Sequence, residues 1–331
     1  MARRPLPGEF ELIARHFAPL AAGAPGAFGL TDDVATVDLG PDEQLVVKTD
    51  AIVAGVHFLP ADPPDLIARK LLRVNLSDLA GKGARPLGYL MTCCFPNDLD
   101  EAWLARFVEG LAADQREFGL PLLGGDTAAT PGPLTLSATA LGAIAKGRLP
   151  WRGAARAGDA VLVSGSLGDG ALGLDVQRHA FPEIDAAGRD YLIDRYRLPQ
   201  PRLGLGRALV EAGLVHAAMD ISDGLLADLG HICSTSRVGA TVEWPRLPLS
   251  APAMKLVSVR PELRERIVAG GDDYELLLTV AAADVPAALS LAQRERGALT
   301  PIGCVTAGSG VRIVDETGVE MAIARTGYRH F

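Results

Sequence analysis

Aspartates in glycine- and serine-rich segments are the feature that most constrains this 331-residue chain. All but Asp220 lie directly beside Gly, Ser, Thr or another Asp, and most of the set fall where a predicted strand gives way to a turn. Any one of them is ordinarily a turn former or a helix N-cap. The set consists of Asp32, Asp33, Asp50, Asp78, Asp126, Asp220 and Asp223.

The composition favours an α/β protein of two domains. Apolar residues make up 48% of the chain and aromatic residues only 5%, which indicates an aliphatic interior. A chain of 331 residues exceeds the size at which one core usually divides. Residues 146–158 contain Pro150 and several Gly and Arg residues, so we predict domains at 1–149 and 150–331.

Charge and cysteine usage exclude several classes of protein. Lys and Arg total 32 against 40 acidic residues, with no basic cluster, so a nucleic-acid partner is not expected. The four cysteines lack Cys-x-x-Cys spacing and indicate buried thiols in a reducing compartment. Neither a signal peptide nor an apolar run that spans a bilayer is recognisable, so we expect a cytoplasmic protein without a membrane partner.

Short strands and long helices alternate along the first half. The helix over 65–79 carries Asn75 and Asp78 three residues apart, hence on one face. Strands are predicted at 45–47, ending at Lys48-Thr49-Asp50, at 89–95, and at 134–145 after a turn at 124–127. A second long helix is predicted over 100–118.

The second half repeats one local order, namely strand, glycine-rich turn and helix. It occurs at 160–163, 164–170 and a helix to about 179, and again at 217–219, 220–224 and a helix to about 232. Because free N–H groups at the start of a helix point at the preceding turn, each turn is a plausible anion cradle.

The aspartates as a set favour a magnesium site. Mg²⁺ takes hard oxygen ligands and is typically held by one or two carboxylates together with substrate phosphates. Several Asp-bearing turns that converge on a triphosphate would meet that need, whereas capping requires no convergence. The P-loop is absent, since Gly142 and Gly147 are followed by Arg148-Leu149, and neither a dinucleotide fingerprint nor a Gly-x-Ser-x-Gly elbow is present.

Taken in order, these segments resemble the thiamine-monophosphate kinase family, which shares a superfamily with aminoimidazole ribonucleotide synthetase, selenophosphate synthetase and a hydrogenase maturation factor. The resemblance covers nearly the whole chain. It rests on Gly8-Glu9-Phe10, Thr31-Asp32-Asp33, Thr49-Asp50, Gly55-Val56-His57-Phe58, Val74-Asn75-Leu76-Ser77-Asp78-Leu79, Gly124-Gly125-Asp126-Thr127, Asp220-Ile221-Ser222-Asp223-Gly224-Leu225 and Gly270-Gly271-Asp272-Asp273-Tyr274-Glu275-Leu276.

The resemblance implies ATP-dependent phosphorylation of thiamine monophosphate to thiamine diphosphate, with several Mg²⁺ ions. It implies an N-terminal mixed sheet with helices that forms a homodimer, and a C-terminal α/β domain. Asp78, Asp126 and Asp220 would be catalytic, Gly125, Asp126, Arg152 and Ser222 would contact ATP, and His57, Asp272 and Tyr328 would line the thiamine site. The metal ligands would be Asp33, Thr49, Asp50, Asp78, Asp126, Asp220 and Asp223.

Three positions depart from the family pattern. Thr31 stands where Gly is common, which is tolerable where φ is not positive. Lys48 stands where Ser or Thr usually precedes Thr49-Asp50, and its ammonium cannot ligate Mg²⁺ but would occupy one metal's place electrostatically. Asp272 replaces the usual Glu, which retracts the carboxylate by one methylene and favours a longer or water-mediated substrate contact.

The implied acceptor is a phosphate monoester that is mostly dianionic at neutral pH, so it needs no strong general base. Alignment and charge neutralisation would then carry the reaction, and we expect direct in-line transfer without a phosphoenzyme. Two alternatives stay open, namely another ATP-dependent synthetase of the superfamily and a catalytically idle thiamine-phosphate binder. The first cysteine is Cys93 and the chain ends in Phe331, which fits the selenophosphate and hydrogenase relatives poorly.

Overall fold

The computed structural model describes residues 6–328, which divide into two compact units. Unit 1 holds the described residues up to Leu79 together with Ala84–Lys146, and unit 2 holds Ala80–Gly83 together with the described residues from Gly147 onward. The domain boundary at 149/150 stays a prediction, because compactness does not test independent folding. Within residues 6–328, no helix is both long and apolar enough to cross a membrane.

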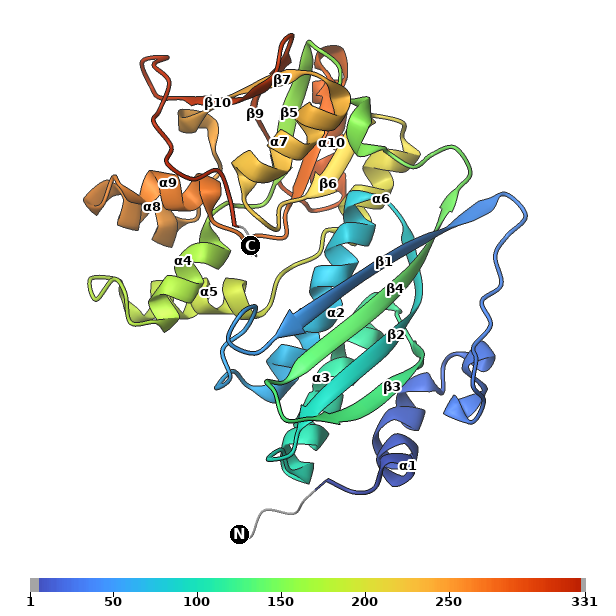
Figure 1. Ribbon diagram of the computed structural model, residues 1–331. Helices are drawn as coiled ribbons and strands as arrows, with labels where there is room; N and C mark the ends of the chain where they lie inside the picture. The colour runs from blue at the N-terminus through green and yellow to red at the C-terminus, as the bar shows by residue number, and fades with distance from the viewer. Residues whose placement is uncertain (1–5, 329–331) are drawn as a thin grey trace. The chain divides into compact units, whose positions relative to one another are not determined.

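Unit 1 is built on a four-stranded mixed sheet in the order β1-β4-β2-β3 (Figure 1). Strand β4 runs antiparallel to β1 and to β2, while β3 runs parallel to β2. The elements are α1 (Glu9–Leu12), which continues as the π-helical turn η1 (Ile13–Phe17), the 3₁₀ helices η2 (Ala18–Ala21) and η3 (Pro25–Leu30), β1 (Glu43–Val53), α2 (Pro64–Gly81), β2 (Arg85–Pro96), α3 (Glu101–Phe118), β3 (Leu122–Thr130) and β4 (Thr135–Ala145).

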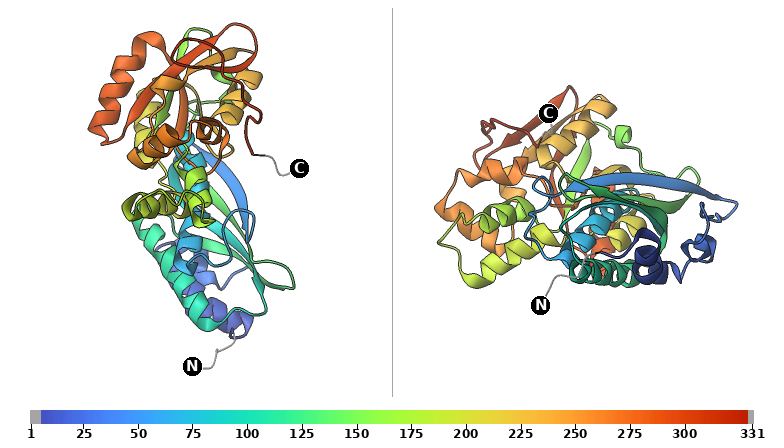
Figure 2. Two further views of the ribbon diagram at one scale, coloured as in Figure 1. Left: turned by 90° about the vertical axis from the view of Figure 1, so that its left-hand side faces the viewer. Right: turned by 60° about the horizontal axis from the view of Figure 1, so that its bottom comes forward.

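Helices α2 and α3 lie on one face of this sheet (Figure 2). Helix α3 begins where predicted, because the carboxylate of Asp100 accepts a hydrogen bond from the Trp103 N–H at 2.8 Å, and it ends at Gly119 with φ of 64°. The buried carboxylate of Asp114 on α3 accepts hydrogen bonds from Arg69 and Arg73 of α2, each at 2.7 Å, and so joins the two helices.

Strand β1 is longer than predicted, and its alternation decides which side chains face the helices. Leu45, Val47 and Thr49 are exposed on one face, while Lys48 and Asp50 point to the other. Asp50, predicted at the end of a strand, lies inside β1, and the prediction of a turn at Asp126 is wrong because Asp126 lies inside β3. Local glycine content suggested a turn at 124–127, but hydrogen bonding to β2 keeps this segment extended.

Unit 2 holds a six-stranded sheet in the order β10-β7-β9-β5-β8-β6, in which only β10 and β7 run parallel. Its elements are η4 (Arg152–Ala154), β5 (Asp159–Ser164), α4 (Asp169–Gln177), α5 (Ala186–Arg197), α6 (Leu203–Glu211), β6 (Val215–Asp220), α7 (Leu225–Ser236), β7 (Gly239–Glu243), η5 (Trp244–Arg246), α8 (Ala251–Val259), α9 (Leu263–Ala269), β8 (Leu276–Ala281), η6 (Ala282–Asp284), α10 (Val285–Arg294), β9 (Leu299–Thr306) and β10 (Gly310–Val314).

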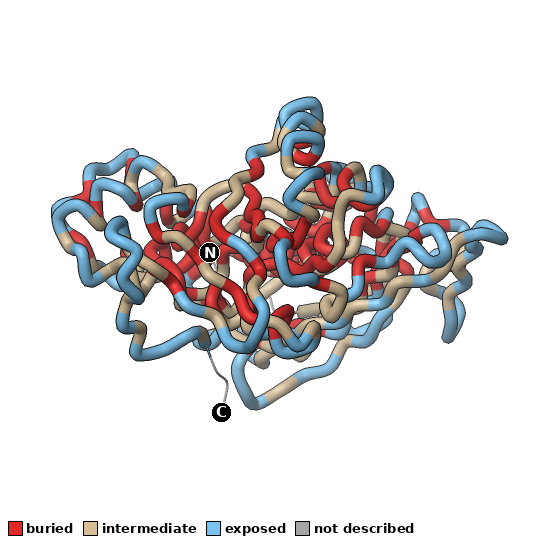
Figure 3. The backbone as a smooth tube through the Cα atoms, turned by 90° about the horizontal axis from the view of Figure 1, so that it is seen from above, coloured by how far each residue is buried: buried red, intermediate tan, exposed pale blue. Residues whose placement is uncertain are grey.

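The core of unit 2 has aliphatic layers on both faces of the sheet. Val161, Val163 and Leu277 pack with α4 and α7 on one side, whereas Leu162, Leu276 and Leu278 pack with α6 and α10 on the other. Buried segments of the backbone alternate with exposed loops in Figure 3. The predicted strand-turn-helix orders are confirmed as β5 followed by α4 and β6 followed by α7.

Candidate active site

Three loops of unit 2 meet because β8 runs antiparallel between β5 and β6. Leu276, the first residue of β8, pairs with Asp220 at the end of β6, and Leu277 pairs with Val163 near the end of β5. The loop that enters β8, residues 270–275, therefore adjoins the loops that leave β5 and β6, residues 165–168 and 221–224. No single stretch of sequence reveals this meeting.

Main-chain hydrogen bonds join two of these loops directly. The N–H of Asp272 donates to the Ser222 carbonyl at 2.9 Å, and that of Tyr274 donates to the Ile221 carbonyl at 2.7 Å. The C-terminal segment joins them, since the Tyr328 N–H donates to the Asp223 carbonyl at 3.0 Å. Four predicted site residues, Ser222, Asp223, Asp272 and Tyr328, are thus brought together in unit 2. Asp220, the last residue of β6, lies buried beside them.

At both predicted anion cradles, N–H groups donate to carboxylates of the chain itself. The N–H groups of Gly168 and Gly170 donate to the buried Asp273 carboxylate, at 2.8 and 3.3 Å. The N–H groups of residues 222–224 all donate to Oδ2 of Asp228, at 3.0 to 3.2 Å. These donors need a partner in the interior, and a nearby Asp supplies it.

Asp228 is one of three acidic residues that sequence reasoning missed, together with Asp273 and Glu275. Burial raises the pKa of the Asp228 carboxyl to about 7, the charge of Asp223 adds to the shift, and the three N–H donors oppose it. Its position four residues after Gly224, one helical turn into α7, is the signal that could have found it. Asp223, Asp228 and His231 together place three ligand atoms within 4.8 Å of one another, close enough to hold a metal ion.

The backbone of the 270–275 loop is left-handed at two residues other than glycine. Asp272 has φ of 69° and Tyr274 has φ of 52°, a conformation that costs an L-residue roughly 1–2 kcal/mol. Two such residues in one short loop indicate that the surrounding contacts impose its shape, as is common at functional sites.

In unit 1, the structure brings Asp50 and Asp78 together through Lys48. The Lys48 ammonium lies 3.2 Å from Oδ1 of Asp50 and 3.0 Å from Oδ2 of Asp78. Burial lowers the pKa of Lys48, but the charges of Asp78 and Asp50 outweigh it, so the pKa is raised and the side chain is a cation. These two ion pairs of Lys48 include neither Asp33 nor Asp126.

The other predicted residues of unit 1 are more dispersed. Asp33 is exposed in the segment between η3 and β1, and Asp126 is exposed on the edge strand β3. Thr49 faces away from Asp50, and its hydroxyl donates to the Ala138 carbonyl at 3.2 Å. Gly125 has a structural reason to be glycine, because a Cβ there would clash with the carbonyl oxygen of Met91.

Thr31 has φ of −110°, which satisfies the condition under which a residue other than glycine is tolerated there.

His57 lies in the turn after β1. Its Nδ1 accepts a hydrogen bond from the Val53 N–H at 3.1 Å, so a neutral ring carries its proton on Nε2. The His57 carbonyl accepts from the Lys70 ammonium at 2.9 Å, which ties this turn to α2. The first contact orients the imidazole ring, and the second holds the backbone of His57.

The backbone of Arg152 lies near the C-terminal end of α7, whereas the loop at 221–224 precedes its N-terminal end. The Arg152 carbonyl accepts from the Ser236 hydroxyl at 3.3 Å, at the last residue of α7. The 12 residues of α7 span about 18 Å.

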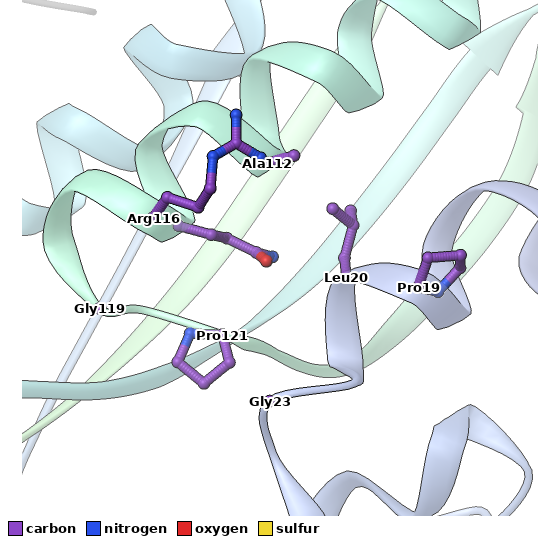
Figure 4. A pocket seen from close by; sticks show the side chains of 8 residues that line it. Pro19, Leu20, Gly23, Ala112, Arg116, Gly119 and Pro121 are labelled. Carbon is purple, nitrogen blue, oxygen red and sulfur yellow. The ribbon is translucent and has the colours of Figure 1, made fainter.

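Unit 1 contains a pocket that none of the predicted site residues lines. It has a volume of about 420 Å³ beside the C-terminal end of α3 (Figure 4). It is lined by Pro19, Leu20, Gly23, Ala112, Gln115, Arg116, Gly119 and Pro121. Since no predicted site residue borders it, we do not assign the reaction to it.

Comparisons with known proteins match both halves of the chain to one family. The description "AIR synthase related protein, N-terminal domain" covers residues 31–144, and "AIR synthase related protein, C-terminal domain" covers residues 156–316. The solved structure of the hydrogenase maturation protein HypE in complex with ATP has a TM-score of 0.78 at 21% identity, which shows the fold alone. The predicted α/β architecture is therefore confirmed.

Relatives over the whole length are more specific. A thiamine-monophosphate kinase of Caulobacter vibrioides is 42% identical over 98% of this chain and 91% of its own, and that of Escherichia coli K12 is 39% identical over 98% of each. Thiamine-monophosphate kinase from Stenotrophomonas maltophilia K279a has a TM-score of 0.83 at 38% identity, over 94% of this chain and 98% of its own. AaThiL complexed with AMPPCP and TMP has a TM-score of 0.76 at 29% identity, over 98% and 97%. The chain belongs to the thiamine-monophosphate kinase family, whose members are ATP-dependent phosphotransferases.

Proposed function

We propose that this protein transfers the γ-phosphoryl group of ATP to thiamine monophosphate, giving ADP and thiamine diphosphate. The single observation that carries the proposal is the set of main-chain hydrogen bonds that gathers Ser222, Asp223, Asp272 and Tyr328. The complex of AaThiL with AMPPCP and TMP supports a nucleotide and a phosphate ester as the two substrates. A cytoplasmic location stays a prediction.

The donor chemistry of the predicted ligands suits Mg²⁺. Every side chain among them offers hard oxygen atoms, and several are carboxylates. We propose Asp33, Thr49, Asp50, Asp78, Asp126, Asp220 and Asp223 as ligands, with Thr49 acting through its carbonyl because its hydroxyl faces away from Asp50. When bound, the ions would neutralise the charge of the phosphate oxygens.

The remaining residues would bind and orient the two substrates. Ser222 and Gly125 would contact ATP, Arg152 would reach a phosphate with its guanidinium fork, and His57, Asp272 and Tyr328 would hold the thiamine end. Because the acceptor phosphate is already an anion near neutral pH, no side chain has to remove a proton from it. Direct in-line transfer without a phosphoenzyme is the simplest reaction that fits.

A homodimer is part of the proposal. The face of the unit 1 sheet that α2 and α3 leave uncovered exposes Leu45, Val47 and Leu90. Strands β1 and β2 both pair with β4, and the register places these three side chains on the same face of the sheet. A self-complementary apolar surface is what a twofold interface requires.

The reaction itself is the first test. Purified protein is incubated with Mg²⁺-ATP and thiamine monophosphate, and thiamine diphosphate is measured by chromatography, with aminoimidazole precursors and selenide as alternative acceptors. Formation of thiamine diphosphate alone supports the proposal. Binding of thiamine monophosphate without release of ADP would favour the alternative of a catalytically idle binder. The observation in favour of that alternative is the Lys48 ammonium, which lies between the proposed metal ligands Asp50 and Asp78.

Replacement of Asp220 by Asn tests the metal ligands. Asp220→Asn keeps the shape of a buried side chain but removes its charge, so we expect turnover to fall by at least about a hundredfold. Circular dichroism and the melting temperature report whether the fold is kept. Near-normal turnover across a Mg²⁺ titration would contradict the assignment.

A further inference from the structure

Glu275 has a fully buried carboxylate held by two arginines. Arg195 donates to its Oε1 at 2.8 Å, and Arg202 donates to its Oε2 at 2.7 Å and to its Oε1 at 2.5 Å. The Ser164 hydroxyl donates to Oε2 at 2.6 Å. Arg195 comes from α5, Arg202 precedes α6 and Ser164 ends β5, so three separate elements converge on one carboxylate.

This carboxylate fixes the end of the strained loop. Glu275 lies one residue after Tyr274 and three after Asp272, the two left-handed residues. Its carbonyl accepts from the Ile221 N–H at 2.9 Å, and Arg195 also donates to the Asp273 carbonyl at 3.5 Å. The same group of contacts therefore holds the loop that carries Asp272 and connects it with the residues that follow β6.

The arrangement is poorly explained by stability alone. A buried ion pair loses hydration on both sides, and well-packed apolar residues in its place are often as stable or more so. Arg195 is in addition shared, since its Nε lies 3.9 Å from Oδ2 of the buried Asp169. The charged groups supply directional hydrogen bonds, which apolar packing cannot. These bonds specify one conformation of the loop, which would otherwise relax and relieve its backbone strain.

We infer that Glu275, held by Arg195 and Arg202, is a positioning residue that sets where Asp272 meets the substrate. The inference rests on the proposed function, in which Asp272 lines the thiamine site. Loss of the Glu275 charge would keep the Asp272 carboxylate but would no longer fix the backbone conformation of Asp272. The affinity for thiamine monophosphate would then fall more than the affinity for ATP.

The test compares Glu275→Gln with a matched control, Asp114→Asn. Asp114 is an equally buried carboxylate between two arginines, but it joins α2 and α3 in unit 1. We expect Glu275→Gln to raise the KM for thiamine monophosphate about tenfold, with the KM for ATP nearly unchanged. Asp114→Asn is expected to lower the melting temperature while leaving both KM values as they are.

Hydrogen exchange provides a readout that does not depend on activity. In Glu275→Gln the amides of Asp272 and Tyr274 are expected to exchange faster, while Asp114→Asn leaves them protected. Arg202→Lys, which keeps the charge but loses the paired hydrogen bonds, is expected to act in the same direction more weakly and serves if Glu275→Gln does not fold.

Each failure is distinguishable. Unchanged KM and exchange in both Glu275→Gln and Arg202→Lys would overturn the inference, and so would an equal rise of both KM values. A wild-type protein that makes no thiamine diphosphate would instead overturn the proposed function, whatever the exchange data show.

Discussion

The Lys48 ammonium lies within hydrogen-bond reach of two carboxylates, those of Asp50 and Asp78. At the scale of single residues, this contact determines how much negative charge the cluster offers to a divalent cation. We predict that Lys48→Thr binds more Mn²⁺ than the parent protein, measured by electron paramagnetic resonance. In EDTA the same variant is expected to be less stable by about 1 kcal/mol, because Asp50 and Asp78 then repel each other.

Lys146→Thr is the control for that experiment, since the Lys146 ammonium is bound to the Pro41 carbonyl and to no carboxylate described here. It is expected to leave the amount of bound Mn²⁺ unchanged. Equal Mn²⁺ binding by Lys48→Thr and the parent protein would show that the ammonium does not stand in for a cation.

At the scale of elements, the start of α4 packs against the loop that enters β8. A Cβ at Gly170 would clash with the carbonyl oxygen of Asp272 and lie 3.0 Å from its Cβ. We predict that Gly170→Ala destabilises the protein by about 1–3 kcal/mol, measured by denaturant unfolding, because the packed backbone cannot make room without moving the loop.

Gly230 serves as a control that distinguishes the effect of this clash from the effect of helix propensity. Gly230 lies inside α7, and a Cβ there would meet nothing within 4 Å. Gly230→Ala is expected to stabilise the protein by roughly 0.5–1 kcal/mol. If both substitutions changed stability by the same amount in the same direction, close packing at Gly170 would not be the reason for its glycine.

At the scale of the whole molecule, the uncovered sheet face of unit 1 leads to a prediction about assembly. Val47 on β1 is 57% exposed, although it is a large apolar residue on a strand. We expect the parent protein to sediment as a dimer and Val47→Asp to sediment as a monomer, because a carboxylate without a partner is costly to bury in an apolar interface.

Val259→Asp is the matched control, since Val259 is 66% exposed at the end of α8 in unit 2. This variant is expected to remain dimeric. Dimers of Val47→Asp that are as tight as those of the parent protein would place the interface elsewhere.

Much of the element order could be predicted, because periodicity and capping act over a few residues. The helix at α3 follows from Asp100 and its apolar spacing, and the strand-turn-helix orders at β5 and β6 follow from their glycines. The turn assigned to Asp126 was wrong, and the strand that carries Asp50 is longer than predicted, because pairing with other strands keeps both residues extended. The roles of Asp228 and Asp273 could not be predicted either, because the N–H groups that donate to them are brought there by the fold.

The sequence by itself determined the family, the α/β class and the identities of the residues proposed for the site, since these depend on residue types in a fixed order. Only the tertiary structure decided which of them meet. Placement of β8 between β5 and β6 joins Ser222 to Asp272, and the Lys48 ammonium joins Asp50 to Asp78. The physical reason is that strand order and side-chain facing arise from long-range pairing, which no local pattern encodes.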